Sequence, residues 1–496
     1  MTDSTRFQVL RAEVGKAVRD AATFPVLVAG GGITGRAATR TFLDAGFRVW
    51  VVDEKALSEN HQKEIAEAQL VQSFKGTADL PKDFPQRFAF VLTSPGIHPK
   101  APFSRWLQSL GAPLFSELDL SFPFLGMPDV AVTGTNGKTT VVTLIAAMLR
   151  ASGIEAELVG NVGYPFLSKL TPEELRAGPP AAPERLICWV AELSSYQLET
   201  VRVISPRVSV LLNIDDDHLE RHGSLEAYLA AKLRIFEDQD PESGIAILNR
   251  DEAWSGSSKT SCTGRVTWFG TEHSTEQHRS MDHGCFYDPE KKQLIFRSPA
   301  GEEGYSLENT KLLGAHNKLN LAASVAAARG AGGTPDGIQS VIDSFTPLEH
   351  RVEHVACVGG VHFVNDSKGT NVSSVRVALD TIASEFSPGK VVLLVGGKMK
   401  EGAWDSVRER LPKLARSVIG FGADGGLVLE QLGLEVGAAG AISVQRIDTL
   451  EHALRAAKAT ASPGDVVLLS PGCASFDAYS DFGARGRHFK QLVHSL

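Results

Sequence analysis

Short hydrophobic runs, each followed by a glycine turn and a stretch with helical spacing, recur along the chain. The first begins at Phe24, where FPVLVAGGGITG leads into a helical segment and a second apolar run that ends at Asp53 and Glu54. This order of strand, turn, helix and strand predicts a βαβ unit. Further strand-like runs follow at 88–92 and 113–115. We therefore expect a small α/β domain over residues 1–123.

The same order begins again at Asp129, where DVAVT leads into GTNGKTT and then VVTLIAAMLR. Val141, Ile145 and Met148 recur there at helical spacing, and strand-like runs continue at 186–191, 208–212 and 245–248. A third set of strands is expected at 362–365, 391–395 and 466–470, with helices over 404–415 and 450–459. The patterns thus predict three tandem α/β domains, of which the second covers residues 124–346 and the third 347–496. We expect the first and third to be Rossmann-like and the central one to be a parallel sheet like that of P-loop ATPases.

Composition narrows the class of protein. The 496 residues carry 58 acidic and 50 basic side chains, a formal charge of −8, so no basic surface for nucleic acid is expected. No run of about 18 apolar residues predicts a membrane span, and the N-terminus lacks the apolar core of a signal peptide. The five scattered cysteines favour a reducing cytoplasm. We expect a cytoplasmic protein with small-molecule partners.

The strongest local motif is the glycine turn from Gly134 to Thr140. A glycine turn between a strand and a helix points backbone N–H groups at phosphate oxygens, Lys138 adds a cation, and a threonine hydroxyl can reach Mg²⁺. Val132 stands where the first glycine of G-x-x-x-x-G-K-[ST] would be, so the motif is shorter than the standard loop. The lysine and both threonines favour a nucleotide site over an ordinary turn.

Acidic side chains follow the next predicted strands. Glu192 ends the apolar run CWVAE, where a neighbouring parallel strand would bring it close to the glycine turn. The following strand ends in Asn213-Ile214-Asp215-Asp216-Asp217-His218, which could be a solvated turn, although its position favours metal binding.

Two further features have ambiguous interpretations. Lys232 lies in the mostly apolar LEAYLAAKLRIF, and taken alone it is typical of a surface lysine whose ammonium reaches water. The first glycine turn, Gly30 to Gly35, matches G-x-G-x-x-G, and Asp53 follows at the spacing of a residue that contacts a ribose. This turn could hold NAD, but it would equally suit the diphosphate of another nucleotide-linked ligand.

Taken in order, several segments resemble the signatures of the Mur ligases, the amide-forming enzymes of peptidoglycan precursor synthesis, over essentially the whole chain. The matching segments are GTNGKTT, GNVG at 160–163, ELSSYQ at 192–197, Asp217-His218, Ala231-Lys232, HNKLN at 316–320, His350-Arg351 and NDSKGTN at 365–371. The resemblance implies ATP-dependent ligation in cell-wall biogenesis, and with it a place in cell shape and cell division.

Within the family, GGGITG, SPGI at 94–97 and SPGCASFDAYSDFGARGRHF resemble the ligases that add D-glutamate to UDP-N-acetylmuramoyl-L-alanine. The Asp-Asn-Pro-Arg motif expected of the diaminopimelate-adding relatives is absent. Three positions depart from the usual pattern, Gly369, Gly472 and Gly483, and they bear on the amino-acid pocket.

The resemblance implies a role for each site residue. ATP and its phosphates would be bound by Gly134, Thr135, Asn136, Gly137, Lys138, Thr139, Thr140, Asn161, Asn317, Arg351 and Asp366. Mg²⁺ would be held by Thr139, Glu192, His218 and Lys232, the last as a carbamate, and Lys138 would join the last three in catalysis. The UDP-linked substrate and glutamate would be bound by Ile33, Thr34, Asp53, Glu54, Ser194, Gln197, Lys368, Thr370, Lys400, Ser475 and Phe482.

In such a site the substrate carboxylate would attack the γ-phosphate, and the amine of the amino acid would then displace phosphate from the acyl phosphate. We expect a monomer whose C-terminal domain closes over the central one to exclude water. The alternatives are a Mur-type or folylpolyglutamate-type ligase for another amino acid, L-glutamate included, a nucleotide-binding regulator without catalysis, and a dinucleotide oxidoreductase.

Overall fold

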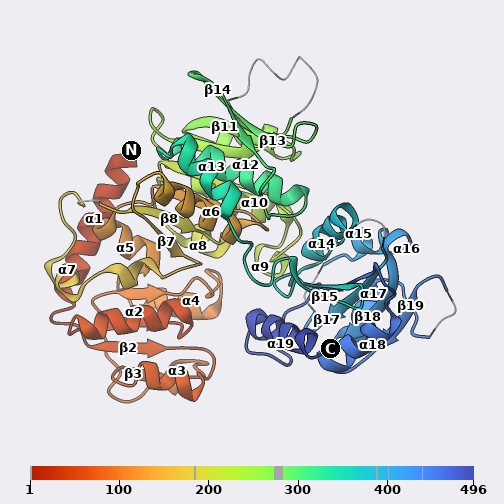
Figure 1. Cartoon of the computed structure of the whole chain (residues 1–496). Helices are drawn as coiled ribbons and strands as arrows, with labels where there is room; N and C mark the ends of the chain where they lie inside the picture. Colours follow the sequence, from red (N-terminus) through yellow and green to blue (C-terminus); the bar gives the residue numbers. More distant parts are fainter. Residues whose placement is uncertain (1–2, 184–185, 273–282, 387–388, 400–401, 438–439) are drawn as a thin grey trace. The chain divides into compact units, whose positions relative to one another are not determined.

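The structure, a computed structural model, describes residues 3–183, 186–272, 283–386, 389–399, 402–437 and 440–496 (Figure 1). The chain forms two compact units. The first comprises Met1–Asn213, Glu226–Tyr305 and Ala322–Val341, and the second Ile214–Leu225, Ser306–Leu321 and Ile342–Leu496. The described residues form three sheets, of five, nine and six strands. The predicted class, α/β with largely parallel sheets in tandem, is confirmed, while the three domain ranges stay a prediction.

The five-stranded sheet has the order β3-β2-β1-β4-β5 and is parallel throughout. Its strands are β1 (Val26–Ala29), β2 (Val49–Val52), β3 (Gln69–Val71), β4 (Val91–Thr93) and β5 (Leu114–Ser116). The helices of this region are α1 (Asp3–Asp20), α2 (Ile33–Asp44), α3 (Glu59–Glu64), α4 (Pro102–Ser109) and α5 (Glu117–Leu125), with a 3-10 turn at Thr77–Asp79.

Both faces of this sheet are buried, which explains why its strands are continuous hydrophobic runs. Val26 and Val28 of β1 belong to one core, with α1, α2 and α5, whereas Leu27 and Ala29 belong to a second core, with α4. Successive side chains of a strand point to opposite faces, so a strand between two helical layers needs apolar residues at every position.

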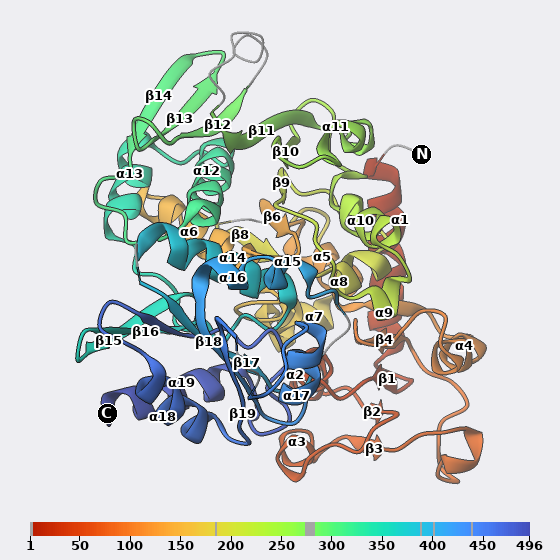
Figure 2. The same ribbon diagram turned by 90° about the vertical axis from the view of Figure 1, so that its right-hand side faces the viewer.

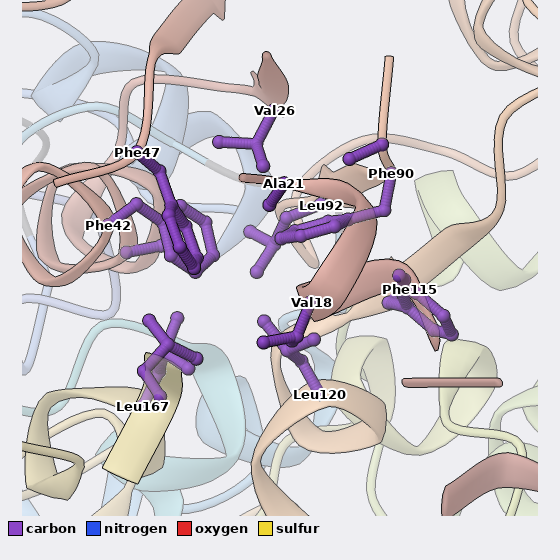
Figure 3. Close-up of a cluster of buried hydrophobic side chains, with 14 of the residues drawn as sticks. Val18, Ala21, Val26, Phe42, Phe47, Phe90, Leu92, Phe115, Leu120 and Leu167 are labelled. Atoms are coloured by element: carbon purple, nitrogen blue, oxygen red, sulfur yellow. The ribbon is translucent and has the colours of Figure 1, made fainter. Parts of the chain in front are cut away.

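The first of these cores extends beyond the five-stranded sheet (Figure 3). Val18 of α1, Phe42 of α2 and Leu120 of α5 pack in one cluster with Leu167, which lies in the central part of the sequence. Arg202 also donates to Glu13 of α1 at 2.6 Å. The N-terminal sheet therefore shares a core with segments from the central part of the sequence, inside one compact unit.

The nine-stranded sheet has the order β14-β13-β12-β11-β10-β9-β6-β8-β7. Neighbouring strands from β12 through β6 to β7 in this order are parallel, whereas β12 and β13 are antiparallel. Figure 2 shows β11 to β14 at one edge of this sheet. Its strands are β6 (Val130–Thr133), β7 (Ala156–Gly160), β8 (Cys188–Glu192), β9 (Val208–Leu211), β10 (Ile245–Asn249), β11 (Arg265–Thr271), β12 (Gly284–Asp288), β13 (Gln293–Ser298) and β14 (Gly301–Ser306). The helices are α6 (Lys138–Ala151), α7 (Pro172–Ala177), α8 (Ser195–Thr200), α10 (Leu225–Leu233), α11 (Ser255–Ser258), α12 (Ala315–Gly330) and α13 (Pro335–Ser344), with 3-10 turns at Phe166–Lys169, Arg234–Phe236 and Lys259–Ser261.

In the middle of this sheet β6 lies between β8 and β9. The carboxyl ends of these parallel strands meet at one edge, so the residues that follow Thr133, Ala191 and Leu211 come together. The predicted sites at Gly134 and Glu192 lie at this edge.

The second unit contains the six-stranded sheet, with the order β15-β16-β20-β17-β18-β19 and one antiparallel pair, β15 with β16. Its strands are β15 (Glu353–Val358), β16 (Val361–Asn365), β17 (Val391–Gly396), β18 (Ala415–Phe421), β19 (Ser443–Arg446) and β20 (Val466–Leu469). Its helices are α9 (Leu219–His222), α14 (Val372–Glu385), α15 (Asp405–Arg408), α16 (Leu411–Leu414), α17 (Gly425–Gln431), α18 (Leu450–Thr460) and α19 (Phe482–His494).

This sheet is also covered on both faces. Leu393 of β17 packs with α14 and α17, and its neighbour Leu394 packs with α18 and α19. The helix expected over 404–415 is wrong in its extent: two short helices occupy it, and Ala415 already begins β18. Pro412, near the start of α16, has no N–H for a helix interior, which explains the break.

Among the described residues, none of the helices has the length and apolarity that crossing a bilayer requires.

Candidate active site

The glycine turn after β6 has the backbone of a phosphate-binding loop. Gly134 has φ +151° and Gly137 φ +85°, and α6 begins at the next residue, Lys138. A Cβ on Gly134 would lie 3.0 Å from Cβ of Leu212, so glycine leaves room for the neighbouring strand. The N-terminal turn of α6 thereby follows the loop directly, the arrangement that favours anions.

Asn213, which follows β9, holds this loop in place. Its main-chain oxygen accepts from Thr135 N at 3.0 Å, and its Oδ1 accepts from Asn136 N at 2.8 Å. Its Nδ2 donates to Asn136 O at 3.1 Å. The sequence reasoning did not assign Asn213 a role, because an asparagine after a strand also fits an ordinary turn.

Two lysines meet at one carbonyl oxygen of the loop. Lys138 Nζ donates to Gly134 O at 2.7 Å and to Thr135 O at 2.8 Å. Lys232 Nζ donates to the same Gly134 O at 2.8 Å and to Thr133 Oγ1 at 3.3 Å. Two cations beside a glycine loop and a helix N-terminus favour a polyphosphate there.

Lys232 is buried, with 1% of its surface exposed, so its interpretation as a surface lysine that reaches water is wrong. Its Nζ lies 4.6 Å from the ring centre of Tyr228, whose hydroxyl accepts from Thr135 Oγ1 at 3.3 Å. Hydrogen bonds and an aromatic face compensate part of the cost of burying this side chain. The sequence reasoning missed Tyr228, which stands four residues before Lys232 and therefore on the same face of α10.

Glu192 lies at the centre of the predicted metal site. It is 2% exposed, its Oε2 accepts from Thr139 Oγ1 at 2.9 Å, and its Oε1 accepts from Asn161 Nδ2 at 2.9 Å. Asn161 N also donates to Glu192 O at 2.9 Å. Three residues predicted from separate motifs are thus brought together. Hydroxyl, amide and carboxylate oxygens are the hard ligands that Mg²⁺ prefers, so this set fits Mg²⁺ with a nucleotide phosphate.

Ser194, two residues beyond β8, forms the N-terminal capping box of α8 with Gln197. Gln197 Oε1 accepts from Ser194 N and Oγ, both at 2.9 Å, and Gln197 N donates to Ser194 Oγ at 3.3 Å. The bonds order the start of the helix that follows Glu192.

The first glycine turn is stabilised by Asp53, whose Oδ2 accepts from Gly31 N at 2.6 Å. A Cβ on Gly35 would lie 1.7 Å from Gly30 O, so the close approach of helix and turn requires glycine. Ile33, at the start of α2, is 76% exposed, an unusual surface for an isoleucine. Ile33, the half-buried Thr34 and the exposed Glu54 thus border a turn that suits a diphosphate.

In the second unit, the backbone around Arg351 is strained. His350 and Val352, on either side of it, have φ +66° and +44°, a region that costs energy for a β-branched residue. The strain is supported by hydrogen bonds, since Asn365 Nδ2 lies 2.9 Å from His350 Nδ1 and Val352 N donates to Asp366 Oδ1 at 3.3 Å. Such strain at a predicted nucleotide-binding arginine points to a functional site.

Asp366 is buried, with 6% exposed, and accepts from Ser470 Oγ at 2.7 Å. Burial raises the pKa of its carboxyl to about 7, although hydrogen bonds from Ser470 and from Val352 N oppose the rise. At the start of α12, the predicted Asn317 donates through Nδ2 to Leu313 O at 2.7 Å.

The residues predicted around glutamate lie on three segments of the second unit. Lys368 Nζ lies 5.2 Å from the ring centre of Phe482, Ser475 is buried, and Thr370 is half-buried. Lys400 lies outside the described residues.

Arg485 was assigned no role from the sequence, although it lies in the segment SPGCASFDAYSDFGARGRHF, which resembles the family. Its side chain is 1% exposed, Nε donates to Ser367 Oγ at 3.0 Å, and both terminal nitrogens donate to Cys473 O at 3.2 Å. Burial lowers the pKa of this guanidinium to about 10. Arg485 thus links the segments that carry Lys368 and Ser475.

His218 belongs to the second unit, whereas Glu192, Thr139 and Lys232 belong to the first. It is the N-cap residue of α9, with φ +57°, and its imidazole lies 3.8 Å from Asp217 and 3.6 Å from Glu220. In the described part of the chain, no three His, Cys, Asp or Glu side chains are grouped as a metal site.

Comparison with known proteins decides the family. Residues 132–328 match the model of the Mur ligase middle domain, and residues 350–473 match that of the Mur ligase glutamate ligase domain. The UDP-N-acetylmuramoylalanine--D-glutamate ligase of Syntrophus aciditrophicus (strain SB) is 36% identical over 95% of this chain and 98% of its own length. The chain belongs to the Mur ligase family.

Other relatives agree with this assignment. A protein of the same name from Koribacter versatilis (strain Ellin345) is 35% identical over 95% of this Mur ligase and 97% of its own chain. The crystal structure of UDP-N-acetylmuramate-alanine ligase from Thermotoga maritima has the same fold, with a TM-score of 0.57 and 17% identity over 95% and 99% of the two chains. Mur ligases form amide bonds at the expense of ATP, and this chain is accordingly an ATP-dependent ligase.

Proposed function

We propose that this Mur ligase joins D-glutamate to UDP-N-acetylmuramoyl-L-alanine through an acyl phosphate, and that it acts as a cytoplasmic monomer. Two relatives named for D-glutamate ligation match it over 95% of its length, which supports the choice of substrates. The observation that carries the chemistry is that Lys138 and Lys232 both donate to Gly134 O, while Glu192, at the end of the neighbouring strand, accepts from Thr139.

The loop and its lysines would bind ATP. The first-turn amides of α6 and the Lys138 ammonium would hold the phosphates, and Asn317, Arg351 and Asp366 would complete the nucleotide site. Thr139 and Glu192 would hold Mg²⁺, whose positive charge would lower the repulsion between the phosphate and the incoming carboxylate. Lys138, at present on the carbonyls of Gly134 and Thr135, would exchange them for phosphate oxygens.

Lys232 would act as a carbamate. Its neutral amine would form an N–C bond to CO₂ and lose a proton, which would change a buried cation into an anion able to bind a second Mg²⁺. His218 would be a further metal ligand. The buried position of Lys232 beside the phosphate loop supports this role, because a carbamate there lies close to the reacting phosphate.

The UDP-linked substrate would bind in the N-terminal part of the sequence and glutamate in the C-terminal part. Ile33, Thr34, Asp53 and Glu54 would hold the uridine nucleotide at the first glycine turn. Lys368, Thr370, Lys400, Ser475 and Phe482 would surround glutamate, whose two carboxylates suit lysines and hydroxyls. The ranges 1–123, 124–346 and 347–496 would then be the domains for the UDP-linked substrate, ATP and the amino acid.

The test is an assay of phosphate release and product mass with ATP, Mg²⁺ and UDP-N-acetylmuramoyl-L-alanine, with D- and L-glutamate in parallel. We expect one phosphate per amide bond with D-glutamate, and no product from the Lys138→Ala variant. Product formed with L-glutamate but not with D-glutamate would contradict the proposal, and so would undiminished amide formation by the Lys138→Ala variant. Labelled bicarbonate, followed by NMR, tests the carbamate: its signal should vanish in Lys232→Met.

A further inference from the structure

The loop that carries His218 is attached to a helix far away in the sequence. Residues Ile214–Leu225 connect β9 to α10. Both of these elements lie largely in the first unit, yet the loop between them belongs to the second unit. Two of its hydrogen bonds come from the N-cap and first turn of α14. Asn371 Nδ2 donates to Asp217 Oδ2 at 3.1 Å, and Ser373 Oγ donates to Asp215 Oδ2 at 2.7 Å.

The electrostatics of this contact favour attachment. Asp215 and Asp217 lie beside the N-terminus of α14, the positive end of a helix of 14 residues. Arg376, one turn further along, lies 3.6 Å from Asp215 Oδ1. The side chain of Asp217 is only 13% exposed, so the bond from Asn371 is shielded from water. These aspartates, which the sequence pattern favoured for metal binding, thus hold the loop on α14.

Asn371 acts on His218 through Asp217. The Asp217 carboxylate accepts from Asn371 through Oδ2 and from the main-chain N of His218 through Oδ1, the latter at 3.0 Å. His218 has φ +57°, in the left-handed region that few residues other than glycine adopt, and the bond to Asp217 helps to hold it there. Asn371 is itself fixed, because its Oδ1 caps α14 by accepting from Ser374 N at 2.9 Å.

We propose that Asn371 is a positioning residue for His218. The amide of Asn371 holds the carboxylate of Asp217, and that carboxylate accepts from the main-chain N of His218, so the bond from Asn371 keeps the loop in the backbone conformation from which the imidazole projects. The consequence for catalysis rests on the proposed function: with His218 as a metal ligand, loss of the bond from Asn371 would weaken the binding of Mg²⁺.

The decisive variant is Asn371→Asp. Aspartate caps a helix as well as asparagine does, so the bond to Ser374 N is kept, but a carboxylate replaces the amide that donates to Asp217. The double variant Asn371→Asp/Asp217→Asn reverses donor and acceptor and restores the bond. Asn309→Asp is the matched control, because Asn309 Nδ2 faces Asp343 Oδ1 at 3.5 Å on an exposed part of the same unit.

The first readout is hydrogen–deuterium exchange of peptides over 214–225 in the protein without ligands. We expect exchange at least about tenfold faster in Asn371→Asp, the factor for losing a hydrogen bond between charged and neutral groups, with recovery in the double variant and no change in Asn309→Asp. Wild-type exchange in Asn371→Asp, or failure of the double variant to recover, would overturn the proposal. Should Asn371→Asp unfold, Ser373→Ala, which removes only the donor to Asp215, must give faster exchange of the same peptides.

The second readout is the Mg²⁺ dependence of phosphate release. In Asn371→Asp we expect the half-saturating Mg²⁺ concentration to rise about tenfold and to return in the double variant. An unchanged Mg²⁺ dependence together with faster exchange of the loop would refute the role of Asn371 in positioning His218 for metal binding. If the wild type released no phosphate with D-glutamate, the proposed function would fail, whereas the exchange of the loop would still decide the attachment to α14.

Discussion

Glu192→Gln separates the charge of the proposed metal ligand from its hydrogen bonds. In the wild type both carboxylate oxygens accept at 2.9 Å, one from Thr139 Oγ1 and one from Asn161 Nδ2. Glutamine has the same shape: its Oε1 can accept from Asn161, and its Nε2 can donate to the Thr139 hydroxyl, which accepts as well as donates. The substitution therefore removes a buried negative charge and keeps both contacts.

The expected effects on stability and activity differ in size. Because a buried charge is costly and both hydrogen bonds persist, the free energy of unfolding should change by less than about 1 kcal/mol. The loss of a carboxylate that binds Mg²⁺ at the transferred phosphate should lower kcat at least about 100-fold, or about 2.7 kcal/mol of transition-state stabilisation.

The assay is phosphate release at saturating ATP and substrates over a titration of Mg²⁺, with thermal unfolding measured on the same samples. Glu157→Gln is the control, because Glu157 lies on β7 of the same sheet and pairs at its surface with Lys169, so both quantities should stay near wild type. Activity of Glu192→Gln within about twofold of wild type at every Mg²⁺ concentration would refute the role of the charge. A large loss of stability would refute the claim that its hydrogen bonds are retained.

Three further substitutions test the site and its support. Lys232→Met should abolish activity but change the free energy of unfolding by no more than about 1 kcal/mol in a denaturant titration, because Gly134 O keeps its bond from Lys138. Gly160→Ala should destabilise the protein by at least about 2 kcal/mol in the same measurement, because a Cβ there would lie 2.4 Å from Glu192 O and the residue has φ +94°. Asp366→Asn should stabilise the protein in a pH-dependent manner: burial raises the folded pKa from 3.8 to about 7, so the wild type loses stability as the pH rises through this interval. The advantage of Asn should grow by up to about 4 kcal/mol over the interval and stay constant above it, while nucleotide binding weakens.

Each of these has a clear contrary result. Severe unfolding of Lys232→Met would show that the lysine is structural, and full stability of Gly160→Ala would mean that the turn relaxes more easily than its geometry indicates. If the stability difference between Asp366→Asn and wild type did not vary with pH, the carboxyl would not carry the raised pKa.

The glycine turns could be predicted because they depend on local rules. A glycine run after a β-rich segment and before a helical pattern specifies a strand–turn–helix unit, whose geometry makes Gly134 to Thr140 a phosphate loop. Glu192 was also within reach, since the carboxyl ends of neighbouring parallel strands meet. The two short helices in 404–415 were not, because helical spacing alone does not show where a proline divides a segment.

The sequence by itself determined the strand–turn–helix units that begin at Phe24 and Asp129, the phosphate loop and the family, since these depend on neighbouring residues and on motifs in a fixed order. Only the tertiary structure decided that Lys232 is buried beside Gly134, that Arg485 links two segments of the second unit, and that Asn371 holds the loop of His218. Each of these pairs residues about 100 or more positions apart. Such contacts follow from the packing of sheets and helices against one another, which no local pattern of hydrophobic and polar residues specifies.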